Sequence, residues 1–429
     1  MNTSSSRKAY QRTIKQLSDR IVAVQGPIRI LDAINWRDDI RKEFFAHGCR
    51  ELPKIGADYY ERRALGFDPE KTRLELYSIE RDITRELGQL NPLAKMMRRT
   101  CSEFQTVVRM LEARGTPTFC NIAQELYGSP SDVFHAGDPT IAELGTMLES
   151  TVSSLLQAGG MQEEPRNLSA AQSVEILQQR IHNVFPEEQV RVIISDGIAS
   201  DAAAGSDYIK LNQDSWFNQR DLDILEVHEG WVHLGTTLNG AAQPYCTFLS
   251  KGTPAATVTQ EGLAVLSEII TLRSGPKRLY KLVNRIRAIT LAEDGADFLD
   301  VFNYLREKGI EAEDCYAIVS RIFRGSTPTG KPFVKDISYI KGFVLTYNFI
   351  RVAVARGMLD RLPLLFVGKI VLDDAKIIYE LMQDDIIAKP KFIPPVFSDF
   401  KGLAAWLSFG RFIGSLSFEQ LEKDYSLLF

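Results

Sequence analysis

The spacing of apolar residues predicts α-helices along much of the chain. Apolar side chains recur every three or four residues within 7–24, 72–87, 93–113 and 141–156, which is the period of one face of an α-helix. Prolines and glycines stand between these stretches, as they do between helices. We therefore expect the chain up to residue 185 to form a helical N-terminal region.

A different pattern begins near residue 190. Residues 190–194 are rich in β-branched side chains, and residues 206–211 alternate between apolar and polar, which is typical of strands. Because the small residues at 202–205 suit a turn, we expect the two strands to form a hairpin. The helical period returns at Asn218. The expected fold class is α+β and mostly helical, with one small sheet.

Chain length and net charge limit the number of domains and the kinds of partner that we expect. The chain has 429 residues, more than one compact core usually holds. We therefore expect two parts, a helical N-terminal region at 1–185 and a catalytic domain at 186–429. The net charge of −4 lacks the basic surplus of nucleic-acid binders, so no nucleic-acid partner is expected.

The cysteines and the apolar runs bear on the cellular compartment. The five cysteines are far apart and form no CxxC pair, which argues against a disulfide framework or a cysteine zinc site and fits a reducing cytoplasm. The first 20 residues lack the apolar core of a secretory signal. The longest apolar run, 362–372, is shorter than the roughly 20 residues that span a bilayer. We therefore expect a cytoplasmic protein without a membrane partner.

One predicted helix carries a candidate metal site. Asn218 is a good N-cap, and Gly240 is typical of a helix end. Between them stand His228, Glu229 and His233. Neutral imidazoles are preferred zinc ligands, and a neighbouring carboxylate can act as a general base on a metal-activated water. This helix therefore offers two ligands and a catalytic acid/base.

The spacing of this HExxxH motif does not suit an ideal α-helix. Five positions separate His228 from His233 and turn their side chains ~140° apart, whereas four positions would leave only ~40° between them. A π-bulge between them would absorb the extra residue, and Gly230 makes such a distortion less costly. We therefore expect an irregular helix here. The alternative is a regular helix with two unrelated histidines.

A second predicted helix supplies the third candidate ligand. Residues 257–273 have a helical pattern that opens with a capping box of Thr257 and Gln260. This places Glu261 in the first turn, and two histidines with one glutamate form a known catalytic zinc set with an open fourth position. The alternative for Glu261 is an acid that stabilises the helix N-terminus. Glu268 on the same helix is the rival ligand.

These motifs together resemble a known family. They are His228-Glu-x-x-x-His233, Gln260-Glu-Gly-Leu-Ala264, Leu65-Gly-Phe-Asp-Pro69, Arg321-Ile-Phe-Arg-Gly325 and Lys335-Asp-x-x-Tyr339. The combination resembles the QEGLA-motif proteins, whose bacterial members are called flavohaemoglobin expression-modulating. Their eukaryotic relatives are the microtubule-associated tyrosine carboxypeptidases, which remove the C-terminal tyrosine of α-tubulin.

The resemblance implies a zinc metallopeptidase of gluzincin-like layout. It implies one Zn²⁺ per chain on His228, His233 and Glu261, with Glu229 as the catalyst, and the C-terminus of a peptide or protein as the substrate. The tubulin substrate is not carried over. Two alternatives stay open: a regulatory protein that binds a metal without hydrolysis, and a zinc endopeptidase.

Residues near a glycine-rich loop are candidates for binding the substrate. The loop at 325–330 imitates a phosphate-binding loop, but no apolar strand precedes it, so nucleotide binding is not expected. Arg324, Lys335 and Arg321 flank it and could pair with a terminal carboxylate, and Tyr339 could donate to a developing oxyanion. The alternative is ordinary surface charge with a half-buried tyrosine.

Overall fold

The elements before the small sheets are helices. The computed structural model describes residues 3–157, 164–196, 198 and 200–425. The helices are α1 (Thr3–Gln25), α2 (Ile30–Ile34), α3 (Asp38–Ala46), α4 (Ala57–Glu61), α5 (Pro69–Leu87), α6 (Pro92–Glu112), α7 (Pro117–Tyr127), α8 (Ile141–Gln157) and α9 (Ala170–Val184). The longer ones, α1, α5, α6 and α8, confirm the four predicted helices.

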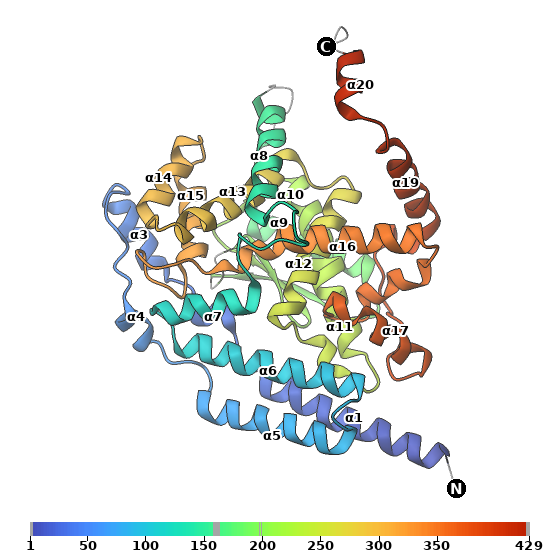
Figure 1. Cartoon of the computed structure of the whole chain (residues 1–429). Helices are drawn as coiled ribbons and strands as arrows, with labels where there is room; N and C mark the ends of the chain where they lie inside the picture. The colour runs from blue at the N-terminus through green and yellow to red at the C-terminus, as the bar shows by residue number, and fades with distance from the viewer. Residues whose placement is uncertain (1–2, 158–163, 197, 199, 426–429) are drawn as a thin grey trace.

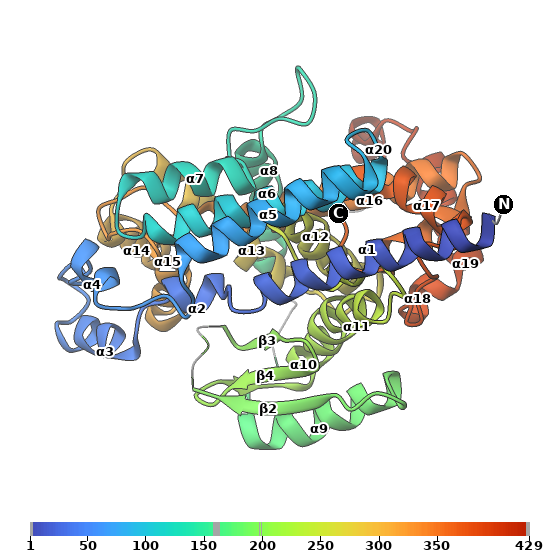
Figure 2. The same cartoon turned by 90° about the horizontal axis from the view of Figure 1, so that it is seen from below.

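The described residues form two small sheets, whereas the sequence predicted one. The strands are β1 (Leu168–Ser169), β2 (Arg191–Ser195), β3 (Ala202–Ala204), β4 (Tyr208–Asn212) and β5 (Trp216–Phe217). β1 pairs with β5, and the other three form a sheet in the order β2-β4-β3. Figure 2 shows this sheet and α9 on one side of the helical body.

The rest of the described chain is helical. It contains α10 (Gln219–Leu225), the π-helix η1 (Glu226–Leu234), α11 (Gly235–Ala241), η2 (Thr247–Ser250), α12 (Pro254–Ile270), α13 (Pro276–Glu293), α14 (Phe298–Glu307), α15 (Ala312–Phe323), η3 (Val334–Ile337), α16 (Ser338–Ala355), η4 (Leu359–Phe366), η5 (Leu372–Asp374), α17 (Ala375–Gln383), α18 (Pro395–Ser398), α19 (Phe400–Ile413) and α20 (Phe418–Tyr425). The predicted α+β class is therefore confirmed. Figure 1 shows α12 near the centre of this body.

The predicted hairpin is wrong in its pairing. β2 and β4 run parallel, and β4 instead pairs antiparallel with β3, which consists of the small residues that were expected to form a turn. The buried side chains Val192, Ile209 and Leu211 belong to one cluster with the apolar face of α9. The alternation at 206–211 therefore matches the buried face of β4, but the strand direction depends on connections that alternation does not describe.

The start of α12 also differs from the prediction. The helix begins at Pro254, and the side chain of Thr253 accepts the N-cap hydrogen bond from Ala256 N–H. Proline at the first helical position after a threonine N-cap is a strong start. Glu261 therefore lies about two turns inside the helix and not in its first turn.

Helices α12 and α16 pack closely against each other through two glycines. A Cβ built on Gly262 would lie 1.9 Å from the backbone carbon of Gly342, and one on Gly342 would lie 1.9 Å from the carbonyl oxygen of Val258. Both positions therefore require glycine, because the opposing atoms are backbone and cannot move aside. The residues of α12 from Thr259 to Glu268 are buried.

The described helices do not include one that could cross a bilayer, since none is both long and apolar enough. The division at residue 185 and the cytoplasmic location remain predictions.

We predict that Gly262→Ala destabilises the fold by roughly 3 kcal/mol or more, because the added methyl group overpacks a backbone contact. Chemical denaturation of the purified protein measures the change. The control is Gly410→Ala in α19, where an added Cβ would meet nothing within 4 Å and should stabilise the helix by up to about 1 kcal/mol. Equal stability of the two variants would contradict the packing argument.

Candidate metal centre

The helix that carries the two histidines is irregular, as predicted. Asn218 caps it, since its side chain accepts from Asp221 N–H at 2.8 Å and the Asp221 carboxylate accepts from Asn218 N–H at 3.0 Å. After α10 the helix becomes the π-helix η1, where the N–H of Gly235 reaches the carbonyl of Gly230. Five residues then make close to one turn.

This geometry brings the two imidazoles together. The ring centroids of His228 and His233 are 4.8 Å apart. A Cβ on Gly230 would lie 2.4 Å from Cδ1 of Ile181, so the glycine lets α9 pack directly on η1. The regular helix with two unrelated histidines is therefore excluded.

Glu261 faces both histidines from α12. Its Oε2 lies 3.5 Å from Nε2 of His228 and 3.6 Å from Nε2 of His233. One donor atom from each of the three side chains lies within 4.8 Å of the others. The three predicted ligands therefore lie close enough together to share one metal ion.

A polar partner at Nδ1 orients each of the two imidazole rings. Nδ1 of His228 lies 2.7 Å from Oε1 of Glu268, and Nδ1 of His233 lies 3.4 Å from Oε1 of Gln260. Because an acceptor occupies each Nδ1, each Nε2 is free to act as a metal ligand. Glu268, the rival ligand in the sequence, thus lies behind His228, on the ring side away from Glu261.

The Glu268 carboxylate is fully buried and is paired with Arg278. Nε and Nη2 of Arg278 donate to its two oxygens at 3.1 and 3.0 Å. Burial raises the pKa of Glu268, but Arg278 and His228 outweigh burial and lower it to about 2. The carboxylate is therefore charged and can hold the His228 Nδ1 proton.

One carboxylate oxygen of Glu261 indicates that these three residues fit a bound cation. Oε1 of Glu261 accepts from Nζ of Lys335 at 2.8 Å, whereas Oε2 is buried and receives no hydrogen bond. An unsatisfied buried carboxylate oxygen is costly, and a cation between it and the two Nε2 atoms would remove that cost. Burial lowers the pKa of His228, but Glu261 and Glu268 raise it to about 10 in the metal-free chain. These surroundings favour positive charge.

Glu229, the predicted catalyst, lies beside the sheet. Its Oε2 accepts from the N–H of Ala204 in β3 at 2.8 Å. β3 is an edge strand, whereas β4 is the central strand of its sheet. β4 is therefore paired on both sides and cannot accept a substrate segment as an added strand.

Tyr339 lies between the histidines and a group of buried cations. Its ring centroid is 6.3 Å from that of His228. The Arg285 guanidinium carbon lies 5.3 Å from this centroid, and Nζ of Lys335 lies 5.7 Å from it. Lys335 and Tyr339, the first and last residues of the predicted motif, thus both lie beside the centre. Lys335 belongs to η3 and Tyr339 to α16.

Two guanidinium groups share the carboxylate of Asp336. Arg321 binds it in two-point fashion at 3.0 and 3.1 Å, and Nε of Arg285 lies 3.7 Å from it. The positive charge of Arg321 lowers the pKa of Asp336 despite its burial. Arg321 is therefore engaged within the protein, as Lys335 is engaged by Glu261.

Arg324 retains free hydrogen-bond donors. Only 3% of it is exposed, and its Nη1 donates to Oδ1 of Asn35 at 3.2 Å. Its Nε and Nη2 have no partner. Burial, followed by repulsion from Arg321, lowers its pKa to about 10. A buried guanidinium with two unused donors can bind a carboxylate.

Sequence reasoning missed three residues of this site and gave a fourth another role. Glu268 was considered only as a ligand, and Arg278, Arg285 and Lys369 were not considered. α13 carries the two arginines at ordinary helical positions, so no local signal marks them. Their roles depend on contacts between distant segments.

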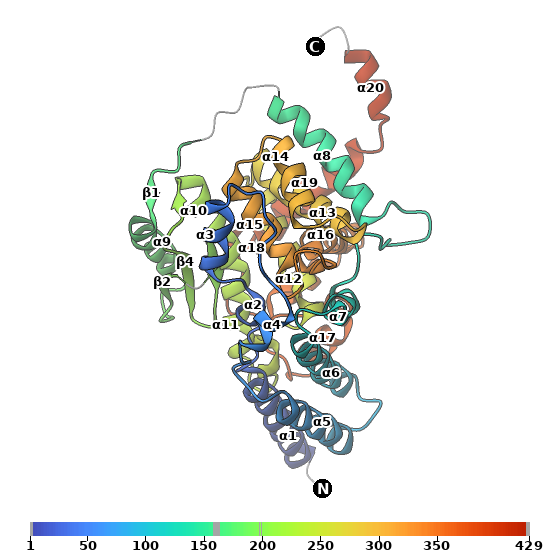
Figure 3. The ribbon, with the colours of Figure 1, turned by 90° about the vertical axis from the view of Figure 1, so that its left-hand side faces the viewer.

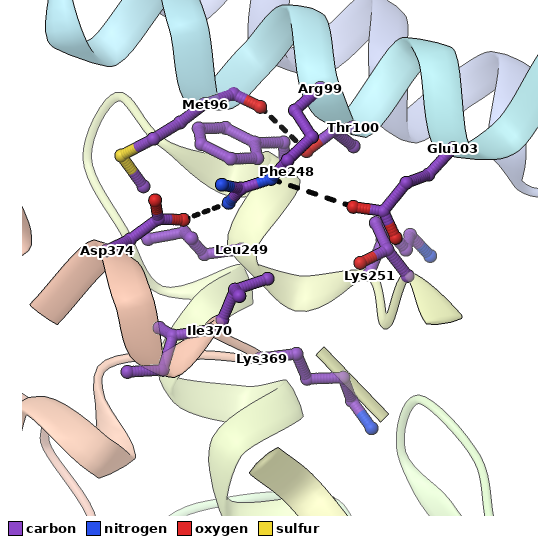
Figure 4. A pocket seen from close by; sticks show the side chains of 12 residues that line it. Met96, Arg99, Thr100, Glu103, Phe248, Leu249, Lys251, Lys369, Ile370 and Asp374 are labelled. Atoms are coloured by element: carbon purple, nitrogen blue, oxygen red, sulfur yellow. Dashed lines mark hydrogen bonds and ion pairs between the residues drawn. The ribbon is translucent and has the colours of Figure 1, made fainter. Parts of the chain in front are cut away.

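A small pocket adjoins the centre through Lys369. Figure 4 shows Arg99 between Asp374 and Glu103, with which it forms ion pairs. These pairs engage both carboxylates of the pocket. The amine of Lys369 points away from them, and the carboxylates of Glu261 and Glu229 act on it, although burial lowers its pKa to about 8.

The fold and the site define an α+β protein, mostly helical, with a His₂Glu constellation and a carboxylate next to it. A profile of the family described as "Microtubule-associated tyrosine carboxypeptidase" matches residues 42–415. The chain belongs to this family, and the resemblance inferred from the motifs is confirmed. Membership indicates an enzyme of the carboxypeptidase type. The curated proteins include no match to the chain.

We predict that Arg278→Leu destabilises the protein by about 3–5 kcal/mol, because it leaves the Glu268 carboxylate buried without a cation. The control is Lys281→Leu on the same helix. It removes a partly exposed pair with Asp314, which should cost less than about 1 kcal/mol. Denaturant unfolding of both variants measures the difference. A similar small loss in both would mean that Arg278 does not compensate the buried charge.

Proposed function

We propose that the protein is a zinc-dependent carboxypeptidase that removes one C-terminal residue from a peptide or protein. The observation that carries the proposal is the Oε2 atom of Glu261, which is buried without a hydrogen bond and faces Nε2 of both histidines. His228, His233 and Glu261 would hold one Zn²⁺, for which this donor set is typical of catalytic sites. A bound zinc ion polarises a carbonyl group and makes water a stronger acid.

Glu229 would move the proton in this reaction. It follows His228 directly, and the Ala204 N–H holds one of its oxygens at 2.8 Å, which fixes the carboxylate. Glu229 would accept a proton from the attacking water and deliver it to the nitrogen of the leaving residue. Tyr339 would donate a hydrogen bond to the carbonyl oxygen as negative charge develops on it.

The excess of buried positive charge supports an exopeptidase. Arg285 and Arg321 share the carboxylate of Asp336, and Arg324 has no ion pair with it but feels its charge, so the three arginines together lack negative charge. A terminal carboxylate of the substrate would supply it. Arg324 has two donors without a hydrogen bond, and Nε of Arg285, although near Asp336, also makes no hydrogen bond. We assign carboxylate binding to these two residues, while Arg321 and Lys335 hold Asp336 and Glu261.

The surroundings of Arg324 support an aromatic terminal residue. Its guanidinium carbon lies 5.6 Å from the centroid of the Phe333 ring. Phe119 and Tyr127 also contact Phe333, with ring centroids 5.6 and 5.7 Å away. These rings are buried and make the surroundings of the Arg324 guanidinium aromatic. Tyrosine, which the family description names, fits this preference.

We predict that Glu229→Gln keeps bound zinc and loses turnover by about 10²–10⁴-fold, because the amide keeps the shape of the side chain but cannot take a proton. His233→Ala should lose both zinc and turnover, and the exposed His135→Ala should lose neither. Metal analysis by mass spectrometry, beside cleavage of peptides with a C-terminal tyrosine, measures both properties. Wild-type protein that binds no zinc would refute the proposal. A zinc-bound Glu229→Gln variant with normal turnover would assign the proton transfer to another residue.

We predict that a peptide with a free C-terminus is cleaved and that the same peptide amidated at its C-terminus is not. Arg324→Ala should raise KM for the free acid by about 10–100-fold, since hydrogen bonds to a charged group contribute about 1.5–3 kcal/mol. The control is Arg287→Ala, two residues after Arg285 in α13, where the arginine lies over Tyr304. Equal cleavage of the amidated peptide, or cleavage in the middle of the peptide, would favour the endopeptidase alternative.

A further inference from the structure

The C-terminal arm, residues 400–425, extends away from the helical body. Figure 1 shows α19 and α20 at the edge of the body, and Figure 3 shows α20 extending beyond it. Leu403 and Leu407 attach α19 to a cluster of buried residues that includes Ile350 of α16. From Ser408 to Tyr425 every side chain is exposed except Leu421, which is half-buried. The second half of the arm therefore has little contact with its own body.

The exposed side chains of the arm are large and apolar. They are Trp406, Phe409, Phe412, Ile413, Leu416, Phe418 and Tyr425. Phe412 is 67% exposed and Phe418 is 77% exposed. An aromatic side chain carries roughly 150–250 Å² of surface, so the arm leaves roughly 700 Å² of mainly apolar surface in water. The largest patch on a typical monomer is only about 300–600 Å².

We infer that the arms of two copies of this chain pair antiparallel about a two-fold axis and form a homodimer. The exposed area of the arm is close to the roughly 800 Å² that each partner contributes to a standard interface. A two-fold interface uses the same patch on both copies, so one arm supplies both halves of the contact.

The charges of the arm favour the antiparallel arrangement. α19 carries Lys401 and Arg411 and no acidic residue, whereas α20 carries Glu419, Glu422, Lys423 and Asp424. Antiparallel pairing places the basic α19 of one copy beside the acidic α20 of the other. Parallel pairing would place like charges together.

The same charges favour a second copy over a membrane surface. The arm has three basic and three acidic residues, so its net charge is zero. Helices that lie on membrane surfaces carry a polar face rich in lysine and arginine. The arm lacks such a face.

The test is the mass of the full-length protein in solution, measured by sedimentation velocity over a range of micromolar concentrations. We expect a dimer for the wild type. The double variant Phe409→Glu with Phe412→Glu should weaken the dimer by at least about 100-fold and sediment as a monomer. The matched controls are Leu74→Glu and Leu90→Glu, which replace equally exposed leucines of the N-terminal region and should stay dimeric. A wild-type monomer at every concentration, or a dimeric double variant, would overturn the inference.

Charge reversal tests the direction of pairing. Lys401→Glu with Arg411→Glu places acidic α19 against acidic α20 and should weaken the dimer severalfold. Adding Glu419→Lys and Glu422→Lys should restore it, and a failure to restore would exclude the antiparallel arrangement.

Flotation with vesicles of phosphatidylcholine and phosphatidylglycerol tests the membrane surface as the alternative occupant of the arm. Monomeric protein that floats with the vesicles would replace the second copy by a membrane surface.

Discussion

The contact between the backbones of Gly262 and Gly342 determines where the third donor of the metal centre lies. Glu261 precedes Gly262 directly, so the depth at which α12 packs on α16 sets the distance from its carboxylate to the π-helix. Each residue of the QEGLA motif then has a physical role. Gln260 faces Nδ1 of His233, Glu261 faces both Nε2 atoms, and the glycine permits the helix contact. Leu263 and Ala264 are buried in the core.

The buried carboxylates of Glu268 and Glu261 are each paired with a cation of the protein, whereas one buried guanidinium group is not fully paired. Arg278 compensates Glu268, and Lys335 compensates Glu261. Ions buried without such partners are costly. Within the described residues, Arg324 has two unpartnered donors. We propose that a substrate carboxylate supplies its negative partner. The same argument separates Arg321, which already has Asp336, from a role in binding.

The sequence predicted what local patterns control. The helices before the sheet, the cap at Asn218, the irregular segment between the histidines and the meeting of the three donors follow from period, capping and donor chemistry. The partners behind them could not be predicted in this way. Arg278 and Arg285 look like ordinary helix positions until α13 is placed against α12 and η3. The parallel pairing of β2 with β4 likewise depends on tertiary connections, and the start of α12 depends on a competition between two possible caps.

The π-helix explains how the HExxxH spacing, which would turn the two histidines apart on an ideal α-helix, brings them together here. A π-helical segment is rare and is found mainly at functional sites, so surrounding contacts must hold it in place. Here the capping box of Asn218 fixes the start of the helix, and Gly230 admits Ile181 against its middle. Glu268 and Gln260 hold the two imidazoles from behind. A departure from local preference that several independent contacts maintain indicates a functional requirement. In this chain the requirement is that two histidines five residues apart face one carboxylate.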